Sequence, residues 1–200
     1  MKRILALGGI AAATLAPSIA LAQDAGHFGD QGQLAISTDA NLGLTGSAYT
    51  NQPGSTFTLL LQPGADYFVI PNLSIGGLLL YEHLGSSEGG TTSSSDSFGI
   101  GPRVGYNVRL SDSFSLWPRA SFTFVTTSNS QGNQSFSNNT TEVGLFVPVL
   151  FHPAQHFFLG VGPILSVELS DSNSQNGISV DGGKATTYGI AFTLGGWVGL

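Results

Sequence analysis

The chain has 200 residues and no cysteine, and its 6 Lys and Arg residues stand against 12 Asp and Glu residues. The absence of cysteine excludes disulfides and thiolate zinc sites, and the acidic balance disfavours nucleic acid, whose phosphates bind clustered cations. Charged residues make up only 9% and glycines number 28, as in disordered low-complexity chains, but the regular spacing of the apolar residues argues against disorder.

The first 22 residues have the pattern of an export signal. Met1–Arg3 is a basic head, an uncharged apolar stretch follows, and Ala20–Ala22 is a small-x-small cleavage site. We expect a signal peptide at residues 1–22, followed at residues 23–32 by a flexible periplasmic segment. An uncleaved membrane helix is the alternative, but the apolar run is short and Pro17 interrupts it.

From residue 33 onward, apolar residues alternate with small or polar ones at a period of two, which predicts β-strands. Eight segments follow the pattern, at residues 33–44, 56–70, 73–84, 97–110, 114–126, 141–151, 157–169 and 186–200. Short turns alternate with long polar loops, the latter at residues 45–55, 85–96, 127–140 and 170–185. Short periplasmic turns and long outer loops are typical of transmembrane barrels.

The pattern predicts an all-β fold, an eight-stranded antiparallel up-and-down transmembrane β-barrel over residues 33–200. Backbone groups in lipid must pair internally, so a membrane protein without apolar helices has to be a closed barrel. An even strand number puts both termini in the periplasm. The alternative is a soluble secreted β-sandwich, but its polar face would carry many charges, whereas here that face is mainly Gly, Ser, Thr and Ala.

Five prolines fall inside the predicted strands: Pro63, Pro102, Pro118, Pro148 and Pro163. Proline has no N–H to donate, and a closed barrel has no free edge where that loss is harmless. We therefore expect bulges at these positions, or strand ends that project beyond the bilayer.

Charged residues within the strands fall almost entirely on the face away from lipid. They predict a lumen charge network of Asp39, Asp66, Glu82, Arg103, Arg119, Glu142 and Glu168. Buried charges must be paired or hydrated, and five acids face two arginines, so the excess acids need protons or water. Two roles of this network are compatible with the sequence: it can pack a filled lumen, or it can form a salt-bridge gate in a narrow pore. Trp117 and Trp197 point inward near the periplasmic end, where we expect them to form a lumen floor.

The C-terminal residues Thr193, Gly195, Val198 and Leu200 resemble the barrel-insertion signal of bacterial outer-membrane barrels, although that signal usually ends in an aromatic residue. Together with the segment 99–108, they make the mature chain resemble the outer membrane protein β-barrel domain superfamily, the small eight-stranded barrels of the OmpA/OmpX/OmpW kind. The resemblance implies a bacterial outer-membrane location, contact with outer-membrane lipid, and insertion by the barrel assembly machinery.

The resemblance also implies a structural or surface-interaction role with a largely filled lumen. A narrow channel for ions or small apolar solutes is the alternative, and a lipid-modifying enzyme is a third possibility. Barrels that resemble lipid A deacylases place a His and a Ser two apart on one strand face, but here Gly85 follows His83, and no carboxylate at fixed spacing orients the imidazole. His152 and His156 flank a turn, a weak arrangement for metal. We expect no enzyme activity, no cofactor and no metal.

Overall fold

The computed structural model describes residues 26–49, 52–88, 91–131, 134–175, 178–181 and 184–200. These residues form one sheet made of β1 (Gln33–Tyr49), β2 (Gln52–Ile70), β3 (Leu73–Glu88), β4 (Thr91–Tyr106), β5 (Val108–Arg109), β6 (Phe114–Leu116), β7 (Arg119–Gln131), β8 (Gln134–Phe146), β9 (Val149–Ala154), β10 (Phe157–Gln175), β11 (Ile178–Asp181) and β12 (Thr186–Gly199). Within this part of the chain, no helix has the length and apolar character needed to cross a membrane.

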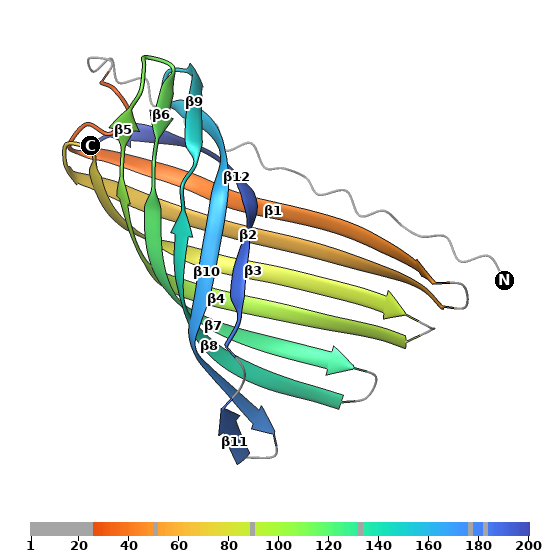
Figure 1. The fold of residues 1–200 in the computed structure, drawn as a ribbon. Helices are drawn as coiled ribbons and strands as arrows, with labels where there is room; N and C mark the ends of the chain where they lie inside the picture. The colour runs from red at the N-terminus through yellow and green to blue at the C-terminus, as the bar shows by residue number, and fades with distance from the viewer. Residues whose placement is uncertain (1–25, 50–51, 89–90, 132–133, 176–177, 182–183) are drawn as a thin grey trace.

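The sheet closes on itself. Its strand order is β12-β1-β2-β3-β4-β7-β8-β10, and β10 pairs with β12 to complete a ring of eight antiparallel strands (Figure 1). The short strands β5, β6 and β9 continue β4, β7 and β8 past local breaks at the end of the barrel that carries the C-terminus. The predicted ring of eight antiparallel strands is confirmed, while the predicted signal peptide lies outside the described residues.

The prolines interrupt the ladders in a different way from the one predicted. Between β2 and β3 the pairing lapses at Gln62 and Pro63, and between β4 and β7 it lapses at Gly101 and Pro102, in both cases with an unchanged register. Pro118 and Pro148 stand at strand breaks, and Pro163 stays paired with β12. Register shifts occur elsewhere, at Phe68/Ile70, Glu168/Ser170 and Phe157/Leu159. The prediction of bulges at the prolines is therefore wrong for the two ladder gaps.

Most of the predicted long loops are strand. The pairing of β1 with β2 continues to Tyr49↔Gln52, that of β3 with β4 to Glu88↔Thr91, and that of β7 with β8 to Gln131↔Gln134. Figure 1 shows these hairpins extending far from the end that carries the C-terminus. Backbone pairing continues past the point where the apolar alternation stops, because a ladder needs no apolar face once it leaves lipid.

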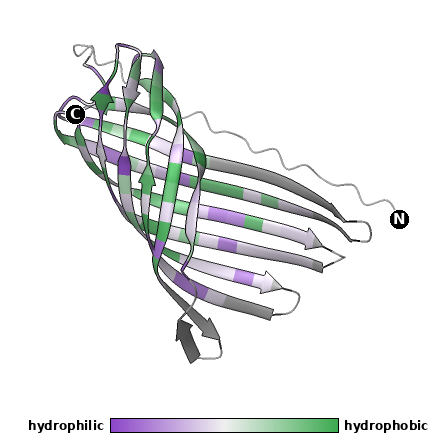
Figure 2. Cartoon of the chain, viewed as in Figure 1, coloured by the Kyte–Doolittle hydropathy of each residue, from purple (hydrophilic) through white to green (hydrophobic). Residues whose placement is uncertain are grey.

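The barrel has apolar side chains on its outside and polar or charged side chains inside, which is the reverse of a water-soluble domain. Outward side chains such as Leu79, Ile100 and Phe192 are 55%, 62% and 63% exposed, whereas the inward Asp66 and Arg103 are buried. In Figure 2 the hydrophobic residues gather in the half of the barrel nearer the C-terminus, and the far ends of the hairpins are pale or purple where they are coloured. A continuous exposed apolar surface of this extent marks a membrane-facing protein.

Candidate functional site in the barrel lumen

Four of the seven predicted lumen charges form one bonded cluster across the barrel. Arg103 of β4 donates from Nε to Asp66 Oδ1 at 3.1 Å and from Nη1 to Asp39 Oδ2 at 3.2 Å, and it also pairs with Asp66 through Nη2. Arg119 of β7 donates from Nη2 to Asp39 Oδ1 at 2.9 Å. The four side chains are buried and their charges cancel, 2 − 2 = 0, so the cluster meets the requirement that buried ions be paired.

Ser37 completes the cluster, and the sequence pattern did not single it out. Its Oγ accepts hydrogen bonds from Arg103 Nη2 and Arg119 Nη1, each at 3.2 Å. The arginines have room because glycines face them: a Cβ on Gly64 would lie 2.5 Å from Arg103 Nη2. A hydroxyl that serves both guanidinium groups ties β1 to β4 and β7 through the centre of the lumen.

The other three predicted lumen charges lie apart from the cluster, toward the hairpin end. Glu142 of β8 and Glu168 of β10 are cross-strand partners, and both carboxylates accept hydrogen bonds: Ser166 Oγ bonds Glu142 at 2.7 Å and the Ala185 N–H bonds Glu168 at 2.8 Å. Glu82 of β3 is half-buried. Within the described residues, none of the three pairs with an arginine or lysine, so the structure separates a neutral cluster from an acidic outer lumen.

A cluster of aromatic side chains fills the lumen beside the charged one. Trp117 is fully buried and Trp197 is 5% exposed, and both contact Phe28, whose ring lies 5.1 Å from each by centroid. Phe68 and Phe158 complete the group, each with its ring 5.2 Å from that of Phe28. We call these five residues the aromatic plug. The Arg119 guanidinium lies 4.3 Å from the Trp117 ring centroid, so the plug and the charge cluster are in direct contact.

Phe28 belongs to the segment predicted to be flexible. The prediction does not hold from Gly26 onward, because residues 26–32 are seated across the barrel mouth. Asn107 Nδ2 donates to the Phe28 carbonyl at 2.8 Å, Asn72 N donates to Gly29 O at 2.7 Å, and Leu200 N donates to Gly32 O at 3.0 Å. Gly29 has φ +103° and a Cβ there would lie 2.6 Å from Asn107 Nδ2, so this turn requires glycine.

A small cavity of about 190 Å³ lies at the mouth between the aromatic plug and the turns. Phe28, His152 and Trp197 are among its lining residues, as are Arg109 and Asp112, which form an exposed ion pair. His152 donates to or accepts from Ser115 Oγ through Nε2 at 2.9 Å. No group of three or more His, Cys, Asp or Glu side chains that could hold a metal occurs within the described residues.

The residues of the predicted insertion signal lie on both faces of β12. Thr193 is buried in the lumen with its Oγ1 3.5 Å from Arg119 Nη2, and the inward Gly195 leaves space for Phe158, whose Cζ would lie 2.6 Å from a Cβ there. Val198 and Leu200 lie outward, and Leu200 is 78% exposed. The sequence signal therefore combines lumen packing with a lipid-side stripe.

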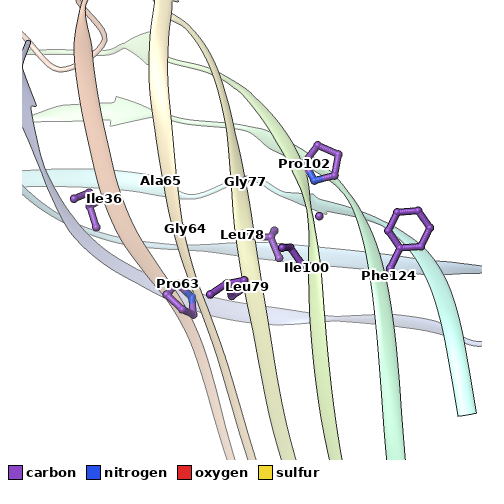
Figure 3. A pocket seen from close by; sticks show the side chains of 11 residues that line it. Ile36, Pro63, Gly64, Ala65, Gly77, Leu78, Leu79, Ile100, Pro102 and Phe124 are labelled. Atoms are coloured by element: carbon purple, nitrogen blue, oxygen red, sulfur yellow. The ribbon is translucent and has the colours of Figure 1, made fainter.

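The outward face carries a hollow of about 710 Å³ beside the two ladder gaps (Figure 3). The small residues Ala65 and Gly77 form its floor, and larger apolar side chains surround them, including Ile36, Pro63, Leu79, Ile100, Pro102 and Phe124. Its walls are apolar and exposed, so in a bilayer lipid chains fill it.

On the same outward face, His83 has a carboxylate partner. Its Nδ1 lies 2.9 Å from Asp96 Oδ1, and Tyr81 OH donates to the same oxygen at 3.2 Å. The sequence offers no carboxylate at fixed spacing to orient His83, but Asp96 lies directly opposite it on β4. Spacing along the chain could not reveal this pair, since cross-strand register fixes it.

Comparison with known proteins agrees with this architecture. The family model described as outer membrane protein beta-barrel domain matches residues 4–195. The chain belongs to this outer-membrane β-barrel family. Its location is therefore the bacterial outer membrane. No curated protein matches the chain closely enough to count as a relative.

Solved structures similar to this outer-membrane β-barrel share little sequence with it. The outer membrane protein OprG from Pseudomonas aeruginosa is 8% identical, with 88% of this chain and 97% of OprG covered and a TM-score of 0.52. Neisserial surface protein A is 12% identical, with 85% and 98% covered and a TM-score of 0.44. The chain spans 61% of the translocator domain of autotransporter NalP from Neisseria meningitidis, with 81% of this chain covered, 14% identity and a TM-score of 0.42. At these identities the similarity concerns the fold alone.

Proposed function

We propose that this protein is a closed outer-membrane barrel with a structural and surface-interaction role, and that its lumen does not conduct. The observation that carries the proposal is the pair of contiguous closures inside the ring: the neutral cluster of Asp39, Asp66, Arg103 and Arg119, and the aromatic plug around Phe28. An eight-stranded barrel has an interior just wide enough for side chains to fill, and here both an ionic and an apolar layer fill it.

We infer that both termini lie in the periplasm and that the long hairpins project from the cell. The described chain starts and ends at the same mouth, where Leu200 N donates to Gly32 O at 3.0 Å. The turns at this mouth are short and the hairpins at the other end are long, which is the asymmetry of outer-membrane barrels. Outer-membrane lipid is then the partner of the apolar face, and Thr193, Gly195, Val198 and Leu200 would be the residues that the barrel assembly machinery reads.

The surface-interaction role draws support from β1. Its pairing with β12 ends at Ala40↔Phe192, whereas its pairing with β2 continues to Tyr49. Beyond Ala40, β1 therefore has a strand on one side only, as far as the described residues show, and Figure 1 shows it at the margin of the extended hairpins. An edge of this kind can accept an added strand from an extended peptide.

A narrow cation channel is the second candidate, and one observation favours it. Glu82, Glu142 and Glu168 leave the outer lumen acidic, which would concentrate cations at that entrance. Such a channel would still have to displace both closures before ions could cross. Catalysis has weaker support, because at the His83–Asp96 pair the position two residues along the strand face is Gly85, which offers no nucleophile.

Conductance in a planar bilayer tests the proposal. The refolded barrel, whose closure is checked by a mobility shift between unheated and boiled samples, should give no unitary current steps. A double variant, Phe28→Ala with Arg103→Ala, removes a side chain from each closure and should conduct if it still folds. Steady steps from the unaltered protein would overturn the closed-lumen function and establish the channel.

A further inference from the structure

The apolar band on the outside of the barrel ends at a definite level on β3, β4 and β7. Phe98 and Phe124 are 64% and 56% exposed, and Tyr81 lies directly opposite Phe98. The next outward pair toward the hairpin tips is His83↔Asp96, and beyond it stand Gly85 and Ser94. The His83–Asp96 pair thus lies one step past the band, at the level where an embedded barrel meets lipid headgroups rather than acyl chains.

The Asp96 carboxylate sets the tautomer of the neutral imidazole. Its Oδ1 is 2.9 Å from His83 Nδ1, and the hydrogen bond from His83 holds the pKa of Asp96 below its ordinary value. Since an ionised carboxylate only accepts, Nδ1 carries the proton, and whenever the ring is neutral Nε2 is a free acceptor. Tyr81, which donates to the same oxygen at 3.2 Å, holds the carboxylate in place.

The free nitrogen faces an open niche. A Cβ built on Gly85 would lie 3.5 Å from His83 Nε2, so the missing side chain leaves space beside that atom. The Phe57 ring flanks the imidazole, with centroids 6.2 Å apart. His83 and Asp96 remain 33% and 41% exposed, which leaves them accessible from the bilayer surface. The niche therefore offers a hydrogen-bond acceptor, an apolar wall and a negative charge.

We propose that His83, Asp96 and Gly85 form a lipid-headgroup site that binds a hydroxyl group of a membrane lipid through His83 Nε2. The acceptor selects a donor, and the Asp96 charge disfavours a phosphate at this position. The hydroxyl belongs to the glycerol headgroup of a phospholipid or to the sugar of a glycolipid, and its acyl chain would run along the apolar band below. The site lies on the outside of the barrel and does not depend on whether the lumen is closed.

Native mass spectrometry of the whole barrel released from nanodiscs tests this site. One set of nanodiscs contains equal parts of phosphatidylmethanol, which is anionic without a headgroup hydroxyl, and phosphatidylglycerol; a second set replaces the latter with lipid A. The unaltered protein should retain the hydroxyl-bearing lipid in about three- to tenfold preference, the selectivity that one hydrogen bond supplies. Preference for phosphatidylglycerol alone identifies a glycerol headgroup, and preference for lipid A alone identifies a sugar.

Two variants keep the histidine: one changes its tautomer and removes the neighbouring negative charge, and the other changes the access to its ring. Asp96→Asn lets the side-chain amide donate to Nδ1, so Nε2 becomes the donor, and Gly85→Ser fills the niche. Both should lose the preference while keeping the mobility shift of a folded barrel, and Gly189→Ala, on the lumen-facing side of β12 with its nearest neighbour atom 3.9 Å from the added Cβ, should keep it. Equal retention of both lipids by the unaltered protein, or an unchanged preference in both variants, would overturn the site. Neither result bears on conductance.

Discussion

Phe28→Ala tests whether the N-terminal turn closes the barrel. Phe28 is 7% exposed, and its ring lies within 5.2 Å of the rings of Phe68, Trp117, Phe158 and Trp197. Removal of a buried phenylalanine costs roughly 3–5 kcal/mol, because apolar contacts are lost and a cavity remains. The small cavity already present at the mouth lets water enter the space, so we expect a loss near the lower end, about 3 kcal/mol.

Intrinsic tryptophan fluorescence detects this change, since the chain contains 2 tryptophans and both contact Phe28. Urea unfolding in micelles, followed by tryptophan fluorescence, should show a lower midpoint, and the native emission should shift to the red and become more accessible to acrylamide. Phe98→Ala, on the lipid face at 64% exposure, is the control and should leave native emission and quenching unchanged. If Phe28→Ala costs less than about 1 kcal/mol and leaves the emission unchanged, the turn does not pack in the mouth as described.

Three further predictions concern the lumen. Arg103→Ala leaves two buried carboxylates short of a partner and should lower the free energy of unfolding by about 3–5 kcal/mol, whereas Arg109→Ala, which breaks an exposed pair, should cost less than about 1 kcal/mol in the same urea titration. Glu142→Gln removes a like charge from a cross-strand pair and should leave stability equal or raise it by up to about 1 kcal/mol; a clear loss would refute the argument that repulsion between Glu142 and Glu168 outweighs the hydrogen bond from Ser166. Gly76→Val should prevent the heat-dependent mobility shift, because a Cβ there would lie 2.0 Å from a neighbouring backbone oxygen, while Gly189→Val should preserve the shift.

The sequence predicted the ring well because lipid and lumen demand different side chains at alternate positions. That demand ends where the strands leave the bilayer. Apolar and polar residues therefore do not alternate in β3 past residue 84 or at the start of β4 at Thr91, and the pattern there resembled a loop. Asp96 fell in that predicted loop, which is why its pairing with His83 was missed. The N-terminal turn was missed for a related reason: one aromatic residue between glycines has no periodicity, and its partners come from three distant strands and the break between β6 and β7.

The sequence predicts more acids than arginines in the lumen, and the places of these acids along the barrel explain how the structure accommodates them. The two arginines bind the two aspartates nearest the aromatic plug, where burial is complete and an unpaired charge would be most costly. The remaining glutamates lie toward the open hairpin end, where Ser166 and the Ala185 backbone each donate a hydrogen bond to one of them and the third, Glu82, is half-buried. A neutral cluster needs no counter-ion and no water column, so the barrel can be sealed by the same residues that hold its strands together.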